Sequence, residues 1–414
     1  MFFMRLALLC DDPAVVPWLD AMAVDSTHEV VVAATISPGG TELLRGRVGI
    51  RPTNQWEDLL IARDIDAVLV GGSEPSLLEA IKQLASAGQP ILFMPQAAQS
   101  STFMYELGLI RDDNRVRLHP ALVHRRDQPF IRLREMLRDG SLGKVQLIQL
   151  EREVNSHSTT GPLPQTVVDA ALLPDLDLLR WLSGDYDQVT AIRTGAAEGA
   201  VMMQTVTLAG RGLPEATWHI QSTSGPEVSR LTVHAERGRA VVERDSVSNE
   251  WVFTDPSGAK VVGNRVDAAR MSLDEFAASL TGGDAPAEWP ELVKVFETLD
   301  ATQRSVKRRR TIELHFEPMS ERATFKTQMT AMGCGVLMLT LLLVLVYLAI
   351  ASLVPQSPQP GDLPDGWERV RGILQIGRVF VFAPPAIFLM LQLLYPLTRP
   401  TSGATSAVEP RESS

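Results

Sequence analysis

Three aspartates in one short segment are the residues best suited to general acid–base chemistry. The segment reads VVDAALLPDLDLLRWLSG and contains Asp169, Asp175 and Asp177. A carboxylate held in a cleft can take up or release a proton at a reacting group. The same residue type also caps helices and occupies turns, which is how we interpret Asp169 and Asp175. For Asp177 two interpretations stay open, a structural hydrogen bond and a ligand contact in a pocket.

Histidines are the other candidates for a base, because their ordinary pKa lies close to neutral pH. His119, His124 and His157 each stand alone in the sequence. We therefore interpret them as structural residues, with a role as base as the alternative. The chain has no pair of histidines at helical spacing and no CxxC motif, so it predicts no metal site.

A further pair of acids, Asp11 and Asp12, follows the first apolar segment, where a dinucleotide-binding protein would hold a pyrophosphate. Such a site needs glycines, so that the backbone can approach the phosphates at a helix N-terminus. Here the segment reads LCDDPAV, and the first glycine is Gly39. Two carboxylates about 5 Å apart repel by roughly 3 kcal/mol at an effective dielectric near 20. The usual phosphate cradle is therefore predicted to be missing.

The elements that must position these acids alternate between strands and helices over residues 1–120. Continuous apolar segments predict buried strands, and amphipathic segments between them predict helices. Strands are expected at 5–9, 29–36, 66–70 and 90–94, and helices at 13–22, 56–62 and 76–87. Asp12 before Pro13 predicts the N-cap of the first helix. This order predicts an α/β fold with a Rossmann-like, doubly wound parallel sheet.

Residues 121–318 predict a second domain of the α+β class. Segments that alternate apolar and polar residues are typical of strands with one solvated face. They occur at 145–153, 189–194, 201–208, 216–223, 230–235, 240–244 and 251–254, with a hairpin turn at Arg237-Gly238. Helices are expected at 130–137, 176–182, 272–280 and 290–306, with Trp181 in the core. The domain should hold a large open antiparallel sheet, and such a face usually needs a partner.

In this order the segments resemble the Gfo/Idh/MocA oxidoreductase family over residues 4 to about 316. DIDAVLV at 64–70, with the strand that leads to Pro95, is similar to the family's third and fourth strands. Arg125-Arg126 followed by GSLGKV at 140–145 resembles its domain junction. LDLLRWLSG at 176–184 resembles the helix after its catalytic segment, and FETLDATQRSVKRRRTIEL at 296–314 its last helix and strand. The resemblance implies hydride exchange between NAD(P) and a sugar or polyol.

The positions that carry this chemistry depart from the family's pattern. The resemblance implies a Glu-Lys-Pro motif, a catalytic Asp-x-x-x-His pair and a further histidine after the third strand. This chain has Met94-Pro95, Ala170 with Pro174, and Leu77 at those places. A thioether and a pyrrolidine cannot relay protons. No catalytic or cofactor-binding set is therefore intact. The possible remnants are Asp169 and Asp177, and the degenerate cofactor positions are Asp11, Asp12, Met94 and Pro95.

The bulk composition narrows the range of partners. A formal net charge of -10 argues against a nucleic-acid partner, which would need a basic face. Cys10 and Cys334 are the two cysteines, too few and too distant for a disulfide framework. One basic cluster exists, at Arg304 and Lys307 to Arg310. It has two interpretations, a solvated helix end and a contact with anionic lipid headgroups.

Residues 319–414 predict a linker at 319–331 followed by two transmembrane helices at 332–354 and 379–397. No charged residue occurs between Lys326 and Asp362. The first span would measure about 35 Å as a helix, enough to cross a bilayer. A polar, proline-rich loop at 355–378 separates the spans, and the tail at 398–414 is expected to be disordered. Because no export signal precedes the large domain, we expect that domain and the tail on the cytoplasmic side of the membrane.

Two functions of different classes follow from these observations. In the first, the chain is a catalytically degenerate member of this family that acts as a binding, scaffolding or regulatory subunit at the membrane, with no cofactor. The alternative is an active NAD- or NADP-dependent oxidoreductase with a rebuilt site for a sugar or polyol derivative. Expected partners are the membrane, a second copy through the open sheet, and an unidentified protein or small sugar-like ligand.

Overall fold

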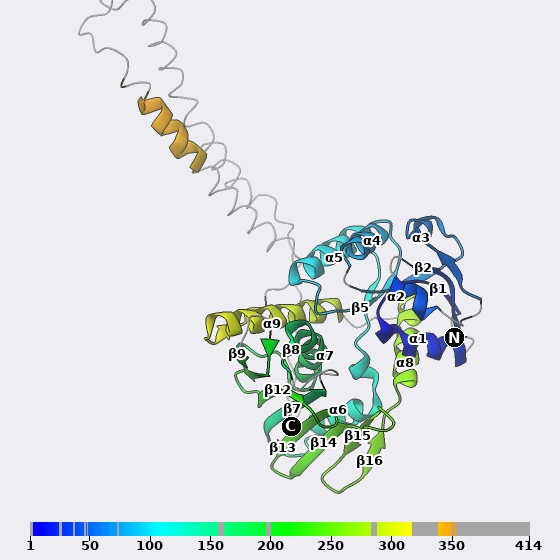
Figure 1. The fold of residues 1–414 in the computed structure, drawn as a ribbon, viewed down its shortest axis with the longest axis vertical. Helices are drawn as coiled ribbons and strands as arrows, with labels where there is room; N and C mark the ends of the chain where they lie inside the picture. Colours follow the sequence, from blue (N-terminus) through cyan, green and yellow to red (C-terminus); the bar gives the residue numbers. More distant parts are fainter. Residues whose placement is uncertain are drawn as a thin grey trace, which may run out of the picture. The chain divides into compact units, whose positions relative to one another are not determined.

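The computed structural model describes residues 3–24, 27–35, 38–44, 47, 49–72, 74–155, 161–195, 200–282, 288–316, 338–349 and 352. The chain divides into two units, Met1–Glu317 and Pro318–Ser414. The first unit holds both large sheets and the helices that cover them (Figure 1).

The first sheet is parallel throughout and has the strand order β3-β2-β1-β4-β5-β6. Its strands are β1 (Met4–Cys10), β2 (His28–Ala34), β3 (Arg51–Thr53), β4 (Ala67–Gly71), β5 (Ile91–Met94) and β6 (Leu118–Pro120). The central strands β1, β4 and β5 are almost completely buried, because helices cover both faces. The predicted Rossmann-like sheet is therefore confirmed, while the short strands β3 and β6 were not predicted.

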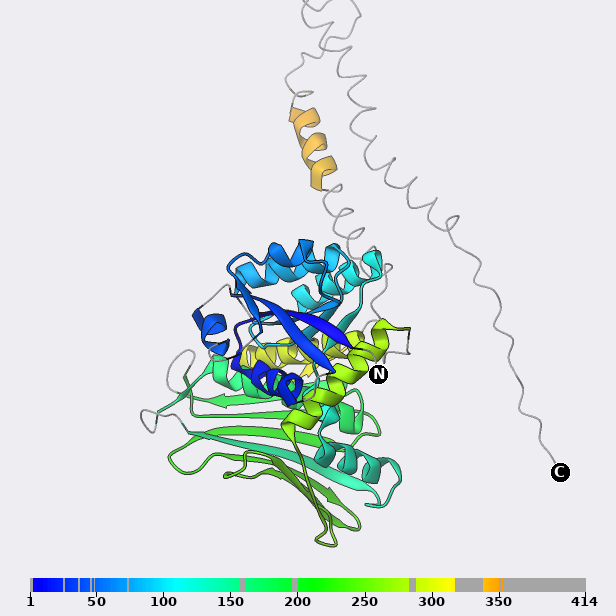
Figure 2. The ribbon, with the colours of Figure 1, turned by 90° about the vertical axis from the view of Figure 1, so that its right-hand side faces the viewer.

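Helices lie on both faces of this sheet (Figure 2). They are η1 (Pro13–Val15), α1 (Val16–Val24), α2 (Pro38–Leu43), α3 (Asp58–Ile61), α4 (Pro75–Ser86) and α5 (Ser101–Asn114). Helix α4 contacts α5, whereas α1 packs with α8 (Arg265–Leu280), which returns from the far end of the unit. Trp18 of α1 and Phe276 of α8 share one buried cluster with Leu6 and Leu8 of β1. The C-terminal part of the unit therefore completes the core of the N-terminal part.

The second sheet is mixed and has the strand order β16-β15-β14-β13-β7-β12-β11-β9-β17. Its strands are β7 (Val145–Asn155), β9 (Gln188–Thr194), β11 (Met203–Ala209), β12 (Glu215–Thr223), β13 (Val228–Ala235), β14 (Gly238–Arg244), β15 (Trp251–Thr254), β16 (Lys260–Val262) and β17 (Ile312–Glu313). Two shorter strands, β8 (Leu163–Pro164) and β10 (Ala200–Val201), pair separately. The expected sheet was antiparallel, but β7 and β12 pair in parallel. A helix follows β7, and the antiparallel pairs β9–β11 and β11–β12 then leave β12 running in the same direction as β7. The hairpin between β13 and β14 is confirmed.

One face of the second sheet is buried and the other is polar. Alternate residues such as Val206, Trp218 and Ile220 are buried, on the face where α7 (Gln165–Ser183) contacts β12 and α9 (Glu288–Arg308) contacts β9. Helix α6 (Gln128–Arg138) contacts β14, β15 and β16. On the other face, His234 Nε2 lies 2.8 Å from Gln149 Oε1, and His219 Nδ1 lies 3.1 Å from Thr205 Oγ1.

Helix α7 differs most from its expected form. It begins at Gln165 and continues through Pro174, so Asp169 and Asp175 lie inside the helix and do not cap it. Trp181, expected in the core, is only partly buried. Proline inside a helix costs about 3 kcal/mol in isolation, and the packing of Leu172, Leu173 and Leu176 in the core offsets this cost.

In the second unit, residues 338–349 form a helix with exposed apolar side chains. Within the residues that the structure describes, no helix has both the length and the apolar character to cross a membrane. The expected span 332–354 extends beyond the described helix on both sides. The expected span 379–397, the linker 319–331, the loop 355–378 and the tail 398–414 lie outside the described residues, as do His157 and Cys334.

Candidate functional site

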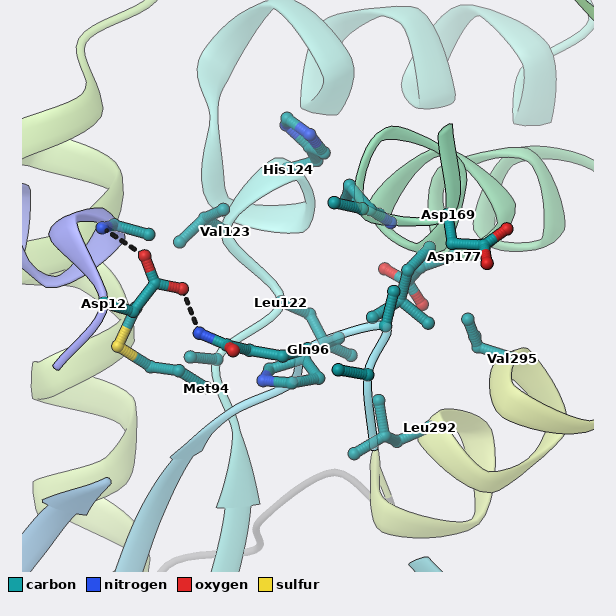
Figure 3. A pocket seen from close by; sticks show the side chains of 18 of the residues that line it. Asp12, Met94, Gln96, Leu122, Val123, His124, Asp169, Asp177, Leu292 and Val295 are labelled. Atoms are coloured by element: carbon teal, nitrogen blue, oxygen red, sulfur yellow. Dashed lines mark hydrogen bonds between the residues drawn. The ribbon is translucent and has the colours of Figure 1, made fainter. Parts of the chain in front are cut away.

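A cavity of about 460 Å³ lies at the carboxyl ends of the first sheet's strands (Figure 3). This edge is where proteins with open parallel sheets usually bind their ligands. Five parts of the chain line it: the β1–α1 connection, the segment after β5, the segment after β6, and helices α7 and α9. Of the positions singled out in the sequence, the lining includes Asp12, Met94, Pro95, Asp169, Ala170, Pro174 and Asp177. Most of the positions that the resemblance singles out therefore line one cavity, whereas Leu77 and Asp11 do not.

Asp12 is the N-cap of the first helical turn, and hydrogen bonds hold both of its carboxylate oxygens. It has an extended backbone and caps η1, and its Oδ1 accepts a hydrogen bond of 2.8 Å from the Ala14 amide. Its other carboxylate oxygen accepts a hydrogen bond from the side-chain amide of Gln96, as Figure 3 shows. The predicted N-cap at Asp12 is thus confirmed. The carboxylate stands where a phosphate-binding protein presents free amides.

The backbone amides around this turn are already engaged. The Asp11 amide donates to Gly71 O at 3.3 Å, and the Val15 amide donates to Asp12 O at 3.1 Å. The Asp12 amide donates to the Cys10 sulfur at 3.4 Å, and Pro13 has no N–H. Together with the Ala14 amide on Asp12, these bonds leave the turn with no donor for a pyrophosphate. These residues do not fit the phosphates of a dinucleotide in the usual way.

Asp11 does not line the cavity. Its side chain lies against Gly72, where an added Cβ would overlap Asp11 Oδ1 and Leu77 Cδ2. Gly72 also has a φ of +141°, a conformation that favours glycine. The side-chain amide of Gln99 donates to Gly72 O at 2.8 Å and its oxygen accepts from the Gln96 amide at 3.0 Å. Gln96 and Gln99 were not singled out from the sequence, although polar residues just beyond a buried strand are a usable signal.

Met94 occupies the position where the family resemblance implies a lysine, and Pro95 is the proline that the same motif retains. Met94 ends β5 and is 7% exposed. Among the described residues that line the cavity, no lysine or arginine occurs. Elsewhere in the described part of the chain, no group of three or more potential metal ligands comes together.

Asp175 and Asp177 of α7 are both matched with arginines. Arg125 donates to Asp177 twice, at 3.0 and 2.5 Å, and both side chains are buried. Asp175 accepts from Arg152 at 2.9 and 2.5 Å and from the indole nitrogen of Trp218 at 2.7 Å. Both oxygens of Asp177 thus serve the ion pair, even though the residue lies on the cavity wall.

Asp169 and His124 are the lining residues with perturbed titration. Burial raises the pKa of Asp169, although Gln165 and Gln303 donate hydrogen bonds of 2.9 and 3.0 Å to its carboxylate. Burial lowers the pKa of His124 to about 4, so its ring is neutral at pH 7. That ring packs edge-on against Phe130 and Trp251, with centroid distances of 5.2 and 5.9 Å. His119 lies apart from the cavity lining, in β6 and against Phe276.

Comparison with known proteins finds similarity in the fold alone. The sequence matches no protein-family model and no curated protein. A putative myo-inositol dehydrogenase from Sinorhizobium meliloti is 18% identical with a TM-score of 0.63, over 75% of this chain and 100% of that chain. A myo-inositol dehydrogenase from Corynebacterium glutamicum is 17% identical with a TM-score of 0.61, over 76% and 99%.

A third solved structure contains bound ligands. The WlbA dehydrogenase from Chromobacterium violaceum, in complex with NADH and UDP-GlcNAcA, is 18% identical with a TM-score of 0.61, over 76% of this chain and 97% of that chain. These similarities show that the first unit has the same fold as these three dehydrogenases.

Proposed function

We propose that the chain is a Gfo/Idh/MocA-type protein that no longer catalyses hydride transfer from a dinucleotide and uses its cavity to bind a small, sugar-like ligand. In this proposal the protein is a binding or regulatory subunit and not an enzyme. The observation that carries it is the first helical turn, where Asp12 and the neighbouring backbone acceptors engage every amide that a pyrophosphate would need.

The energetic argument is electrostatic. A pyrophosphate at this turn would displace the Asp12 cap, which is worth about 1 kcal/mol. It would also face a carboxylate, a repulsion of about 3 kcal/mol at 5 Å and an effective dielectric near 20. Together these costs amount to about 4 kcal/mol, close to a thousandfold in affinity. The lining supplies no arginine or lysine to offset them.

The remaining cavity suits a small polar ligand. Its volume of about 460 Å³ lies in the range typical of small-molecule sites. Apolar side chains such as Trp18 and Leu292 form most of the wall, and Gln96, His124 and Asp169 provide polar groups. A polyol or sugar derivative has the matching combination of apolar faces and hydroxyl groups.

Calorimetric titration of NAD(H) and NADP(H) into the full chain in detergent tests the proposal. We expect no binding at millimolar concentrations for the wild type. Asp12→Asn should recover weak affinity because it removes the charge, and Asp12→Gly should recover more because it also frees the Ala14 amide. Asp11→Asn is the matched control and should change nothing. Micromolar binding by the wild type would overturn the proposal.

A second candidate function is an active oxidoreductase with a rebuilt site. The observation in its favour is that His124 and Asp169, both with shifted pKa, lie on the wall of the same cavity. Such groups are typical of catalytic acids and bases. Turnover of NADH by the purified chain, lost in both His124→Gln and Asp169→Asn, would establish this function and exclude the first.

Membrane attachment is a separate part of the proposal. Its supports are the uncharged sequence between Lys326 and Asp362 and the exposed apolar side chains of the helix at 338–349. The full chain should float with phosphatidylcholine vesicles and resist extraction at alkaline pH. A reporter fused after Ser414 should be cytoplasmic. Release at alkaline pH would contradict attachment, and a reporter on the opposite side would contradict the two-span topology.

Association of two copies through the open sheet is also proposed. The polar face that carries His219 and His234 would form the contact. Sedimentation of the full chain in detergent should show a dimer or larger assembly, and a Thr205→Arg variant should dissociate it. A monomeric wild type would refute this contact.

A further inference from the structure

A second concave site lies away from the cavity and is rich in arginine. This groove has a volume of about 870 Å³ and is bordered by η2 (Val123–Arg126), α6, the end of α7, α8 and the start of α9. Five arginines and three carboxylates line it. We propose that the groove binds a phosphate monoester group.

The three carboxylates of the groove are already matched. Glu275 pairs with Arg126. Asp185 and Glu291 both pair with Arg180 and also with Lys294, at 2.6 and 3.0 Å from its ammonium group. A third arginine of the lining, Arg125, pairs with Asp177 on the cavity side. These partners leave no acidic group of the lining for further cations.

Two arginines of α6, Arg134 and Arg138, therefore carry unmatched charge. Neither has a carboxylate partner among the residues that the structure describes. The pKa of Arg134 is lowered to about 10 by burial and by the neighbouring Arg138, Arg125 and Arg126. A cation crowded by other cations is stabilised when an anion binds beside it. The groove thus has an excess of two positive charges in a chain whose net charge is -10.

Arg134 is also held in position. Its guanidinium carbon lies 4.0 Å from the ring centroid of Trp181, which is the stacking arrangement of a cation–π contact. Stacking fixes the plane of the guanidinium and leaves its N–H groups free at the edges. The sequence predicted Trp181 in the core. The contact shows that it instead stacks on Arg134 at the groove.

Arg180 also lies at the groove wall. It is 3% exposed, and its Nε has no hydrogen-bond partner among the described residues. This donor is closed off from the groove, so the proposal rests on Arg134 and Arg138.

The chemistry of these groups selects the ligand class. A phosphate monoester carries a charge of about −1.5 to −2 at pH 7, which matches the two unmatched arginines. Its oxygens accept paired hydrogen bonds from guanidinium groups. A neutral sugar could accept hydrogen bonds here but would not neutralise the two unmatched charges, so the ligand differs in class from the one proposed for the cavity.

The test compares an Arg134→Gln/Arg138→Gln variant with Arg132→Gln in the full chain. Arg132 lies in the same helix and pairs with Glu135, but it does not line the groove. The first probe is inorganic phosphate, and calorimetry measures its binding. The second is phosphatidylcholine vesicles with and without phosphatidic acid, which present the same group on a lipid. Arg138→Glu provides a check at an exposed position where folding is not at risk.

We expect the double variant and Arg138→Glu to lose about tenfold or more in affinity for at least one probe. Arg132→Gln should bind as the wild type does. Loss with phosphate identifies a soluble ligand, and loss confined to phosphatidic acid vesicles identifies a lipid headgroup. Equal binding by the double variant and Arg132→Gln, or no binding of either probe by the wild type, would overturn the proposal.

Discussion

Arg125 and Asp177 form a bidentate ion pair that joins the wall of the cavity to the wall of the arginine groove. The two contacts measure 3.0 and 2.5 Å, and the side chains are only 7% and 5% exposed. Asp177 lines the cavity and Arg125 lines the groove. Ligands at the two sites would therefore share one buried contact.

Breaking this pair should destabilise the fold strongly. Asp177→Asn leaves the Arg125 charge buried without its counter-ion, which typically costs about 3 to 5 kcal/mol. Unfolding by denaturant measures this loss. Glu135→Gln, which breaks the exposed pair with Arg132, is the control and should cost less than about 1 kcal/mol. Similar losses of unfolding free energy in the two variants would show that the buried pair contributes no more to stability than the exposed pair.

His124 should make the protein less stable as the pH falls. Its folded pKa is about 4, below the ordinary value of 6.5, because burial disfavours the charged ring. The unfolded state therefore binds a proton first, and the stability present above pH 6.5 is lost as the pH falls through 4. The unfolding free energy of His124→Gln, followed from pH 7 to pH 4, should fall less than that of the wild type. Parallel curves would contradict the assignment.

Asp127, three residues after His124, should make the protein less stable as the pH rises. Burial, followed by the charge of Glu250, raises its pKa from 3.8 to about 6. The stability it contributes is present below pH 3.8 and is lost as the pH rises through 6. Asp127→Asn should therefore gain stability relative to the wild type between pH 4 and pH 7. The side chain makes no N-cap hydrogen bond to α6, and the backbone hydrogen bonds from Asn264 and Gln128, which lower its pKa, are outweighed by burial. If the difference in unfolding free energy between Asp127→Asn and the wild type stays constant from pH 4 to pH 7, the pKa of Asp127 is not raised.

Gly72 should tolerate no side chain. Gly72→Ala combines a φ of +141° with overlap against Asp11 and Leu77, and should cost about 2 kcal/mol or more. Gly88→Ala is the matched control: its φ is +80°, but nothing lies within 4 Å of the added carbon. It should cost about 1 kcal/mol. Thermal unfolding compares the two, and an equal shift would mean that the contact with Asp11 is not tight.

Local patterns in the sequence were sufficient for most strands but not for their pairing. The apolar segments that form β1, β4 and β5 are continuous, and the alternation in β11 and β12 is regular. The connection from β7 to its parallel neighbour β12 runs through α7, β9 and β11, and the N-terminal half of α7 was missed because Pro174 normally ends a helix. The strand β3 was missed because Arg51, Pro52 and Thr53 carry no apolar pattern.

The candidate site was predictable in composition and unpredictable in its contacts. The sequence placed Asp12, Met94 and Pro174 at degenerate positions, and the structure brings all three to one cavity. It could not reveal that Asp177 is matched by Arg125, because these residues are far apart in the chain and follow no local spacing rule. Nor could the sequence show that Asp12 lines the cavity and that Asp11 does not.

The position of α9 has a consequence for the timing of ligand capture. Leu292 and Val295 of this helix complete the cavity wall, whereas the first sheet ends with β6 at Pro120. Ribosomes add about 5–20 residues per second, so roughly ten to forty seconds separate the synthesis of the two parts. A nascent chain would thus present an open crevice for that interval. Occupancy of the cavity would then report that translation of the whole first unit has finished.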